Sequence, residues 1–280
     1  MKKIFLSSSS LKNLTYKECL EEFKNLKIKN VELSYNKYDK FQNKEILKTL
    51  KNYNFQIHNY FPNDSKPFFL NLSSVEKTIV TRSINKICNN IKRAKLFNTS
   101  YVSFHAGFLF DIKKKRIVNI YRDYNKAMDV FKKNVEYLSK IAEKYKIMLL
   151  IENNVLTKKN LDFFKFNPLL LTHPKEIESF FKWAPKNVRL IFDTGHFNIN
   201  AKTLKFDKYL GIKKVIKYTE AFQLSENNSI QDENKPISLD SWFMPFLKKK
   251  KFSFFSLELD ENYKNEFKKQ MILLKDYLKK

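Results

Sequence analysis

VRLIFDTGH (188–196) decides the fold, because a run of β-branched and aromatic residues ends abruptly in an aspartate, a glycine and a histidine. IMLLIEN (147–153) repeats the pattern and ends with a glutamate and an asparagine. A short apolar run bounded by polar residues is typical of a strand buried on both faces, as in a parallel sheet. Ionisable residues at the ends of such runs indicate strands whose carboxyl ends open onto a functional site.

Runs of this kind occur eight times, separated by amphipathic segments rich in lysine and glutamate. The eight predicted strands are KIFLS (3–7), NVELSY (30–35), FQIHNYF (55–61), YVSFHAG (101–107), IMLLIEN (147–153), VRLIFDTGH (188–196), YTEAFQLSEN (218–227) and SFFSLELD (253–260). Helices are expected over residues 16–26, 44–52, 75–96, 124–144, 173–182 and 262–280. Eight strand and helix units predict an α/β protein with a single (β/α)8 TIM barrel, and they disfavour the alternative of an open doubly wound sheet.

The length and composition of the chain favour one domain. The chain has 280 residues, and eight βα units need roughly 250, so we expect one barrel domain over residues 1–280. A hydrophobic fraction of 43% with 3 Gly and 7 Pro is typical of a globular protein with a large core. Cys19 and Cys88 are isolated, which predicts reduced core thiols and no disulfide or zinc knuckle.

The sequence also predicts where the protein resides. No apolar run approaches the roughly 18 residues of a membrane span. The apolar run near the amino terminus is too short for the core of a signal peptide. We therefore expect a cytoplasmic protein that does not bind membranes.

The net charge of +25 at pH 7 raises the question of nucleic acid or other anionic partners. The lysines, however, are spread over nearly every predicted helix. The runs KKKR (113–116) and KKKK (248–251) fall between predicted elements, where a solvated surface is the usual explanation. The charge therefore leaves nucleic acid as a partner that is less favoured than a small molecule, and it gives no oligomeric state.

Polar and ionisable residues follow the apolar part of most predicted strands, about one βα unit apart. Three of the four histidines and two of the three glycines, Gly107 and Gly195, belong to these segments. The glycines predict tight exits from their strands, because glycine tolerates unusual dihedral angles and close approach. All these side chains are expected on one face of the barrel; they are Glu32, His58, His105, Glu152, Asp193, His196, Gln223, Glu226 and Glu258.

Carboxylates that converge in a barrel mouth repel one another unless a cation neutralises them. Glu152, Asp193 and Glu258 together with nearby imidazoles supply the mixed oxygen and nitrogen ligands that suit Mn2+, Zn2+, Co2+ or Mg2+. The sequence therefore predicts a divalent-metal cofactor. Any one of these residues alone would be explained equally well as a strand cap or an ion pair.

Six motifs in order resemble those of the xylose isomerase-like barrels, a superfamily of sugar isomerases, ketose epimerases and the endonuclease IV enzymes of DNA repair. The motifs are IHNYFP, VSFHAG, LLIEN, IFDTGH, FQLSEN and SLELD. The resemblance implies one metal held by residues of the last four strands, which in this chain are Glu152, Asp193, Gln223 and Glu258. Gln223 stands where the epimerases have histidine, so it is either a weaker, harder ligand that favours manganese or magnesium or no ligand at all.

The epimerase resemblance also implies a mechanism. Glu152 and Glu258 would be the catalytic pair, one removing a proton beside a carbonyl and the other returning it through an enediolate. His196 would bind a sugar oxygen and Glu226 would orient that histidine, while His58 and His105 would face the same cavity and share a metal or contact the substrate. Trp242, with Phe243, would cover the sugar. An arginine that epimerases often carry soon after the seventh strand is missing from SENNS (225–229), which leaves the sugar undefined.

Two alternatives remain. The segment PFFLNLSS (67–74) before VSFHAG resembles endonuclease IV, whose three zinc sites would fall on His58, His105 and Glu152, on the four predicted ligands above, and on His196, Asp232 and Asn234. Gln223 and Asn234 replace zinc-binding imidazoles there, so a DNA-repair enzyme is less favoured than an epimerase. A metal-free binding protein is the third interpretation, and it would bury a carboxylate trio that nothing neutralises.

A few residues carry simpler expectations. His173 precedes Pro174 at the start of a predicted helix and is expected on the surface or as a cap. Trp183 and Trp242 are expected in the core or at its rim. Glu32 is expected either to reach the site or to form a structural ion pair.

Overall fold

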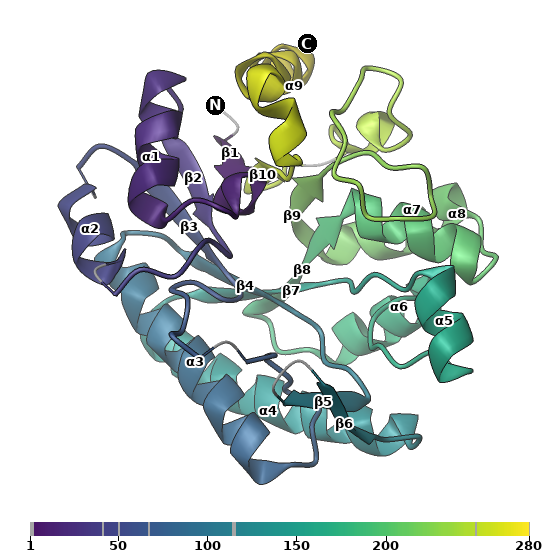
Figure 1. Ribbon diagram of the computed structural model, residues 1–280. Helices are drawn as coiled ribbons and strands as arrows, with labels where there is room; N and C mark the ends of the chain where they lie inside the picture. The colour runs from purple at the N-terminus through teal and green to yellow at the C-terminus, as the bar shows by residue number, and fades with distance from the viewer. Residues whose placement is uncertain are drawn as a thin grey trace.

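Eight parallel strands close into a barrel in the computed structural model, which describes residues 3–40, 42–49, 51–66, 68–113, 116–249 and 251–279 (Figure 1). The single (β/α)8 TIM barrel predicted from the sequence is confirmed. The strands neighbour one another in chain order around the barrel, and the last pairs with the first to close it. They are β1 (Lys3–Ser7), β2 (Asn30–Leu33), β3 (Asn54–His58), β4 (Tyr101–His105), β7 (Met148–Glu152), β8 (Val188–Asp193), β9 (Thr219–Leu224) and β10 (Phe254–Leu257).

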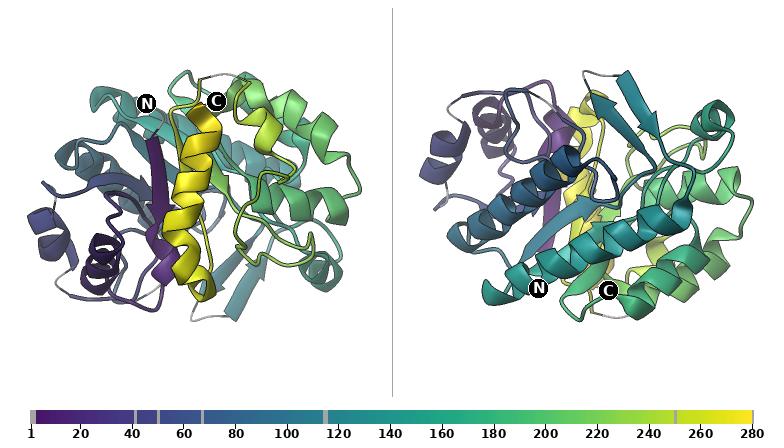
Figure 2. Two further views of the ribbon diagram at one scale, coloured as in Figure 1. Left: turned by 90° about the horizontal axis from the view of Figure 1, so that it is seen from above. Right: turned by 90° about the horizontal axis from the view of Figure 1, so that it is seen from below.

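Helices surround the barrel, and α9 lies against β1, so the two ends of the described chain are adjacent (Figure 2). The helices are α1 (Tyr16–Asn25), α2 (Gln42–Thr49), α3 (Lys77–Leu96), α4 (Tyr124–Lys144), α5 (Lys158–Phe164), α6 (Pro174–Trp183), α7 (Thr194–Thr203), α8 (Lys208–Val215) and α9 (Phe267–Lys279). The expectation of one helix from residue 262 is partly wrong, because residues 261–266 form a 3-10 turn before α9. Residue 280 lies outside the described residues. No helix of the described chain is long and apolar enough to cross a membrane.

His173 caps α6, as expected from its place before Pro174. Its ring nitrogen accepts a hydrogen bond from the backbone N–H of Lys175 (3.2 Å), and the carboxylate of Glu176 accepts from the backbone of His173. These bonds satisfy amide groups that the first turn of a helix leaves without partners.

An antiparallel hairpin after β4 was not predicted. It consists of β5 (Phe110–Lys113) and β6 (Arg116–Ile120), so β5 ends with the first residue of the KKKR run and β6 begins with its last; residues 114 and 115 are outside the described residues. The sequence hides this hairpin because β6 is exposed along its whole length and carries no alternation between buried and solvent positions.

The core has two parts. Side chains that point outward from the strands pack against the helices, while a small inner cluster fills the middle of the barrel. This inner cluster consists of Phe5, Leu150, Ile191, Ala221 and Phe254. Since side chains alternate along a strand, the next inward positions toward the carboxyl ends lie directly above this apolar plug. Those positions are polar.

Two glycines, one after β4 and one after β8, allow neighbouring serine side chains to pack closely against the backbone. A Cβ atom at Gly107 would lie 2.2 Å from the Oγ of Ser73, and one at Gly195 would lie 2.6 Å from the Oγ of Ser225. Neither glycine has a positive φ. The tight exits predicted for these positions therefore rest on close approach and not on unusual dihedral angles.

Candidate metal centre

Glu152 lies at the centre of the polar layer at the carboxyl ends of the strands. It is the last residue of β7, and the β4–β7 register places His105 directly beside it. His58 ends β3, the next strand along. The carboxylate is 1% exposed, because the inner apolar cluster lies below it and the strand-end side chains surround it.

Three imidazoles approach this carboxylate. The Nε2 atom of His58 and the Nδ1 atom of His105 each lie 3.4 Å from Oε2 of Glu152, and Nδ1 of His196 lies 3.0 Å from Oε1. None of these contacts has hydrogen-bond geometry, and neither carboxylate oxygen has a hydrogen-bond partner within the described part of the chain. A buried carboxylate without a hydrogen bond is costly in an otherwise packed protein. A cation held between the carboxylate and the imidazoles would satisfy both.

Two of the histidines are held in place by neighbouring groups. Nδ1 of His58 is 2.9 Å from the hydroxyl of Ser103, so its Nε2 is the atom that faces the carboxylate. Nδ1 of His196 lies 2.9 Å from the backbone carbonyl of Asn153, and its Nε2 lies 3.3 Å from Oδ2 of Asp232, in the loop after β9. Such outer partners fix ring orientation, as they do for metal-bound histidines.

Asp193 is the last residue of β8, and its side-chain carboxylate also caps the start of α7. Its Oδ1 accepts a hydrogen bond of 2.6 Å from the backbone N–H of His196. Asn153 clamps the end of β8, since its Oδ1 accepts from the N–H of Asp193 (2.9 Å) and its Nδ2 donates to the carbonyl of Asp193 (3.1 Å). A strand that passes directly into a helix thus delivers a carboxylate and an imidazole to one point.

The described residues contain two sets of ligand atoms close enough to hold metal ions. In each set the ligand atoms lie within 4.8 Å of one another; the sets are His58 with His105 and Glu152, and Glu152 with Asp193 and His196. Glu152 belongs to both. A metal at this layer therefore has imidazole and carboxylate ligands available, the mixture that suits zinc and manganese.

Gln223 pairs with Glu32 in the barrel interior. Its Nε2 donates a hydrogen bond of 2.8 Å to Oε1 of Glu32, and both side chains are fully buried. The Oε1 atom of Gln223 has no hydrogen-bond partner among the described residues. Glu32 thus reaches the site layer, which is one of the two roles expected from the sequence, and its partner there is an amide and not a cation. The β8–β9 register sets Gln223 beside Asp193, at the edge of the second ligand set.

Glu258 follows β10, and in the barrel order two strands separate β10 from β7. Its Oε1 accepts a hydrogen bond from the hydroxyl of Ser9 (3.3 Å). It belongs to neither of the two ligand sets. Glu152 and Glu258 therefore face the mouth from different sides.

Burial dominates the acid–base behaviour of this layer. It raises the pKa of Glu152 to about 8, of Glu32 to about 7 and of Asp193 to about 6, and it raises that of Glu258 well above the usual range with help from the neighbouring carboxylates. The negative groups crowd one another in a space with little water, so their protonated forms are favoured until a cation enters.

The histidines divide into two kinds. Burial lowers the pKa of His58 to about 3 and that of His105 well below its usual value, so both rings are neutral and available as ligands. Burial also acts to lower the pKa of His196, but Asp193 and Asp232 outweigh it and raise that pKa well above the usual value.

Other predicted site residues lie farther from this centre. Glu226 forms a backbone bridge with Lys235, and it is Asp232 that contacts His196 in the role foreseen for Glu226. Trp242 is 8% exposed and stacks on Phe197 of α7 in the outer aromatic layer, which agrees with the core-or-rim expectation and sets it apart from the polar layer. Asp232 was named from sequence only through the endonuclease IV resemblance, since its loop carries no strand pattern.

Comparison with known proteins identifies the family of this chain. The sequence matches the family described as xylose isomerase-like TIM barrel over residues 20–276. The chain belongs to this family. No protein with a curated description matches it. Family membership confirms the resemblance inferred from the six strand-end motifs.

Solved structures of similar fold cover nearly the whole chain. A D-tagatose 3-epimerase-like protein is 19% identical with a TM-score of 0.74, covering 100% of this chain and 97% of its own. D-psicose 3-epimerase from Clostridium cellulolyticum is 12% identical, with a TM-score of 0.67 and 99% of both chains covered. A Thermus thermophilus protein soaked with ZnCl2 is 14% identical, with a TM-score of 0.65 and 98% of both chains covered. At these identities the similarity establishes the fold.

Proposed function

We propose that this protein is a divalent-metal-dependent isomerase or epimerase of a sugar or sugar derivative. The observation that carries the proposal is the buried carboxylate of Glu152, which three imidazoles approach and no hydrogen bond from the described residues satisfies. The similar structures named as 3-epimerases of ketoses support the same class of reaction. Its substrate in this proposal is a small sugar that enters the barrel mouth.

The residues present fit a metal ion at this layer. By resemblance to the epimerases, Glu152, Asp193, Gln223 and Glu258 would hold it. Of these four, Glu152 and Asp193 lie in one ligand set with His196, and His58, His105 and His196 would be imidazole ligands or substrate contacts. A bound divalent ion would polarise the substrate carbonyl and neutralise negative charge that develops on its oxygen. This fit depends on the oxygens of Glu152 and Gln223 that find no hydrogen-bond donor in the described chain.

Proton transfer is the work of the two glutamates. Glu152 and Glu258 approach the mouth from β7 and β10, so a sugar between them would present opposite faces of one carbon to the two carboxylates. One carboxylate removes the proton beside the carbonyl, and the other, protonated, returns a proton to the opposite face. Burial raises the pKa of both carboxyl groups, and a raised carboxyl pKa suits both tasks because it favours the protonated form that one of the two glutamates needs.

Solvent deuterium tests this two-base chemistry. With ketoses in D2O and a divalent metal, wild-type protein should incorporate deuterium at the epimerised carbon. In Glu258→Gln we expect epimerisation to fall by about 10^2-fold or more, while exchange into the unreacted substrate continues if Glu152 is the base on that side. Mass spectrometry and proton NMR follow both products. Turnover without incorporation of solvent deuterium would contradict the proposal.

Gln223 is the residue at which this chain departs from the epimerase pattern, and Glu32 is its positioning partner. Because the Nε2 of Gln223 is engaged by Glu32, its Oε1 is left as the atom able to bind a metal. In Glu32→Leu the amide of Gln223 loses its hydrogen-bond acceptor. We expect Mn2+ to bind about tenfold more weakly, because removing the hydrogen-bond partner of a metal ligand weakens metal binding at other sites. Glu32→Gln keeps an acceptor oxygen and is the matched control.

Isothermal titration with Mn2+ separates these outcomes, and thermal melts of both variants verify folding. Near-wild-type affinity in Glu32→Gln with weaker binding in Glu32→Leu is the expected pair of results. Equal affinity in wild type and both variants would show that Gln223 is not oriented toward the ion by Glu32.

A second function is favoured by one specific observation. His58 and His105 lie against Glu152, and His196 lies against Asp232, which are the pairs that the endonuclease IV resemblance implies for its outer metal sites. Metal-dependent incision of abasic-site DNA, abolished by Glu152→Gln and without turnover of any sugar, would favour that reaction over epimerisation.

A further inference from the structure

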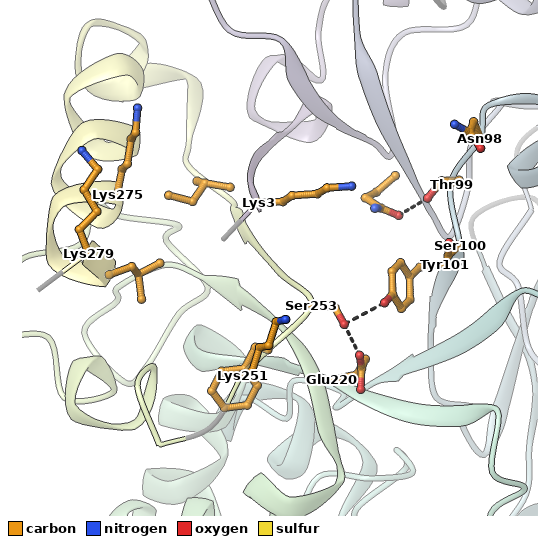
Figure 3. Close-up of a pocket in the computed structure, with 14 residues that line it drawn as sticks. Lys3, Asn98, Thr99, Ser100, Tyr101, Glu220, Lys251, Ser253, Lys275 and Lys279 are labelled. Carbon is orange, nitrogen blue, oxygen red and sulfur yellow. Dashed lines mark hydrogen bonds between the residues drawn. The ribbon is translucent and has the colours of Figure 1, made fainter. Parts of the chain in front are cut away.

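A cavity opens at the opposite end of the barrel from the metal centre (Figure 3). Its volume is about 850 Å³, and its lining comes from the amino-terminal ends of strands together with α9. Lys3 begins β1, Tyr101 begins β4, and Ser253 directly precedes β10. The chemistry proposed for the mouth uses none of these residues.

The lining carries an excess of positive charge. Lys3, Lys251, Lys275 and Lys279 face a single carboxylate, Glu220. Within the described residues, Lys3, Lys251 and Lys275 have no carboxylate within 4.0 Å, whereas Lys279 pairs with Asp276 at 3.4 Å. Figure 3 shows Lys251 with its amino group near Ser253 and Lys3 pointing toward Thr99, while Lys275 and Lys279 lie together on α9 at the far side of the view.

The single carboxylate is engaged by the wall of the cavity. Tyr101 donates to the hydroxyl of Ser253 (2.8 Å), and Ser253 donates to Glu220. These bonds hold the Glu220 carboxylate against the wall, and within the described residues it makes no ion pair with Lys3, Lys251 or Lys275.

A buried amide adds donors beside the lysines. Gln56 is 6% exposed, and its Oε1 accepts a hydrogen bond from the hydroxyl of Thr99. That bond fixes the orientation of the amide. No acceptor for the N–H groups of Gln56 is found in the described chain, so they are available to a ligand in the cavity. Ammonium and amide donors together suit the oxygens of a multiply charged anion.

We propose that this cavity binds a small phosphate-bearing molecule. Its volume lies in the range of sites for small ligands. Lys3 and Lys251 supply two ammonium groups and Gln56 supplies amide donors, and this set of donors matches an anion with two negative charges better than it matches one carboxylate. The cavity is a concave pocket and not a linear basic surface, which favours a small molecule over the backbone of a nucleic acid.

Gln56→Glu is the sharpest variant for this test. The new carboxylate still accepts the hydrogen bond from Thr99, so packing is kept, but the N–H donors are replaced by a negative charge. Lys3→Gln/Lys251→Gln removes the two flanking charges at exposed positions. The matched control is Lys133→Gln/Lys144→Gln, which removes the same charge from exposed positions on α4.

Isothermal titration with pyrophosphate and with glucose 6-phosphate, at fixed ionic strength and with EDTA to keep divalent ions out of the barrel mouth, provides the readout. We expect saturable binding to wild type and to the control, binding about tenfold weaker in the double lysine variant, and none measurable in Gln56→Glu. Thermal melts verify that each variant is folded. No saturable binding of either probe to wild type, or an equal loss in the control and the pocket variants, would overturn the proposal.

Discussion

Glu152→Gln is expected to lower the epimerisation rate by on the order of 10^3-fold and to weaken metal binding at the same time. The amide keeps the size of the side chain but can neither remove a proton nor neutralise a cation. Because Glu152 is shared by both sets of candidate ligands, this one change affects every metal that the layer could hold. Initial rates at saturating Mn2+ and the metal content of the purified protein are the measurements.

Glu143→Gln is the matched control, since Glu143 is an exposed glutamate on α4 away from the barrel mouth. It should leave the rate and the metal content unchanged. A Glu152→Gln protein that retains full activity would remove the basis of the proposed mechanism.

Removal of divalent metal is expected to abolish activity and to lower thermal stability in a pH-dependent way. In the metal-free protein, burial raises the folded-state pKa of Glu152 to about 8 and of Glu32 to about 7, whereas an unfolded glutamate titrates near 4.3. The folded state therefore binds more protons than the unfolded state between these values. The free energy of unfolding should fall as pH rises from about 4 to about 8.

Metal should offset this loss, because it neutralises the same carboxylates without protons. At a hundredfold excess over its Kd, an ion contributes about 2.7 kcal/mol, so the rise in melting temperature on adding Mn2+ should be several degrees at pH 8 and smaller at pH 5. Calorimetric melts with EDTA and with Mn2+ at both pH values measure it. A metal effect that is equal at both pH values, or larger at pH 5, would argue against carboxylate ligands with raised pKa values.

The barrel could be predicted from sequence because parallel strands buried on both faces leave a strong local signal. The runs before Glu152 and Asp193 are almost wholly apolar, and both strands end where the sequence changes to polar residues. The exposed hairpin of β5 and β6 lacks that signal. Short helices such as α7 were missed because α7 is buried on nearly all sides and has no amphipathic period to detect.

The sequence predicted which residues belong to the candidate site better than it predicted which of them contact one another. Strand-end position brings Glu152, His58 and His105 to one layer, and this follows from the alternation of side chains. The pairing of Gln223 with Glu32 could not be foreseen, because it joins residues from β9 and β2 that lie far apart in the sequence. The contact of Asp232 with His196 depends on the path of a loop, which strand periodicity does not determine.

Anomalous diffraction from crystals soaked with MnCl2 would show whether Glu152 binds a metal ion. We expect a manganese peak at the carboxyl end of the barrel, about 2.0 to 2.3 Å from a carboxylate oxygen of Glu152, with an imidazole from the histidines around it as a further ligand. A fully soaked crystal without a peak at Glu152, or with manganese bound only elsewhere, would contradict this expectation.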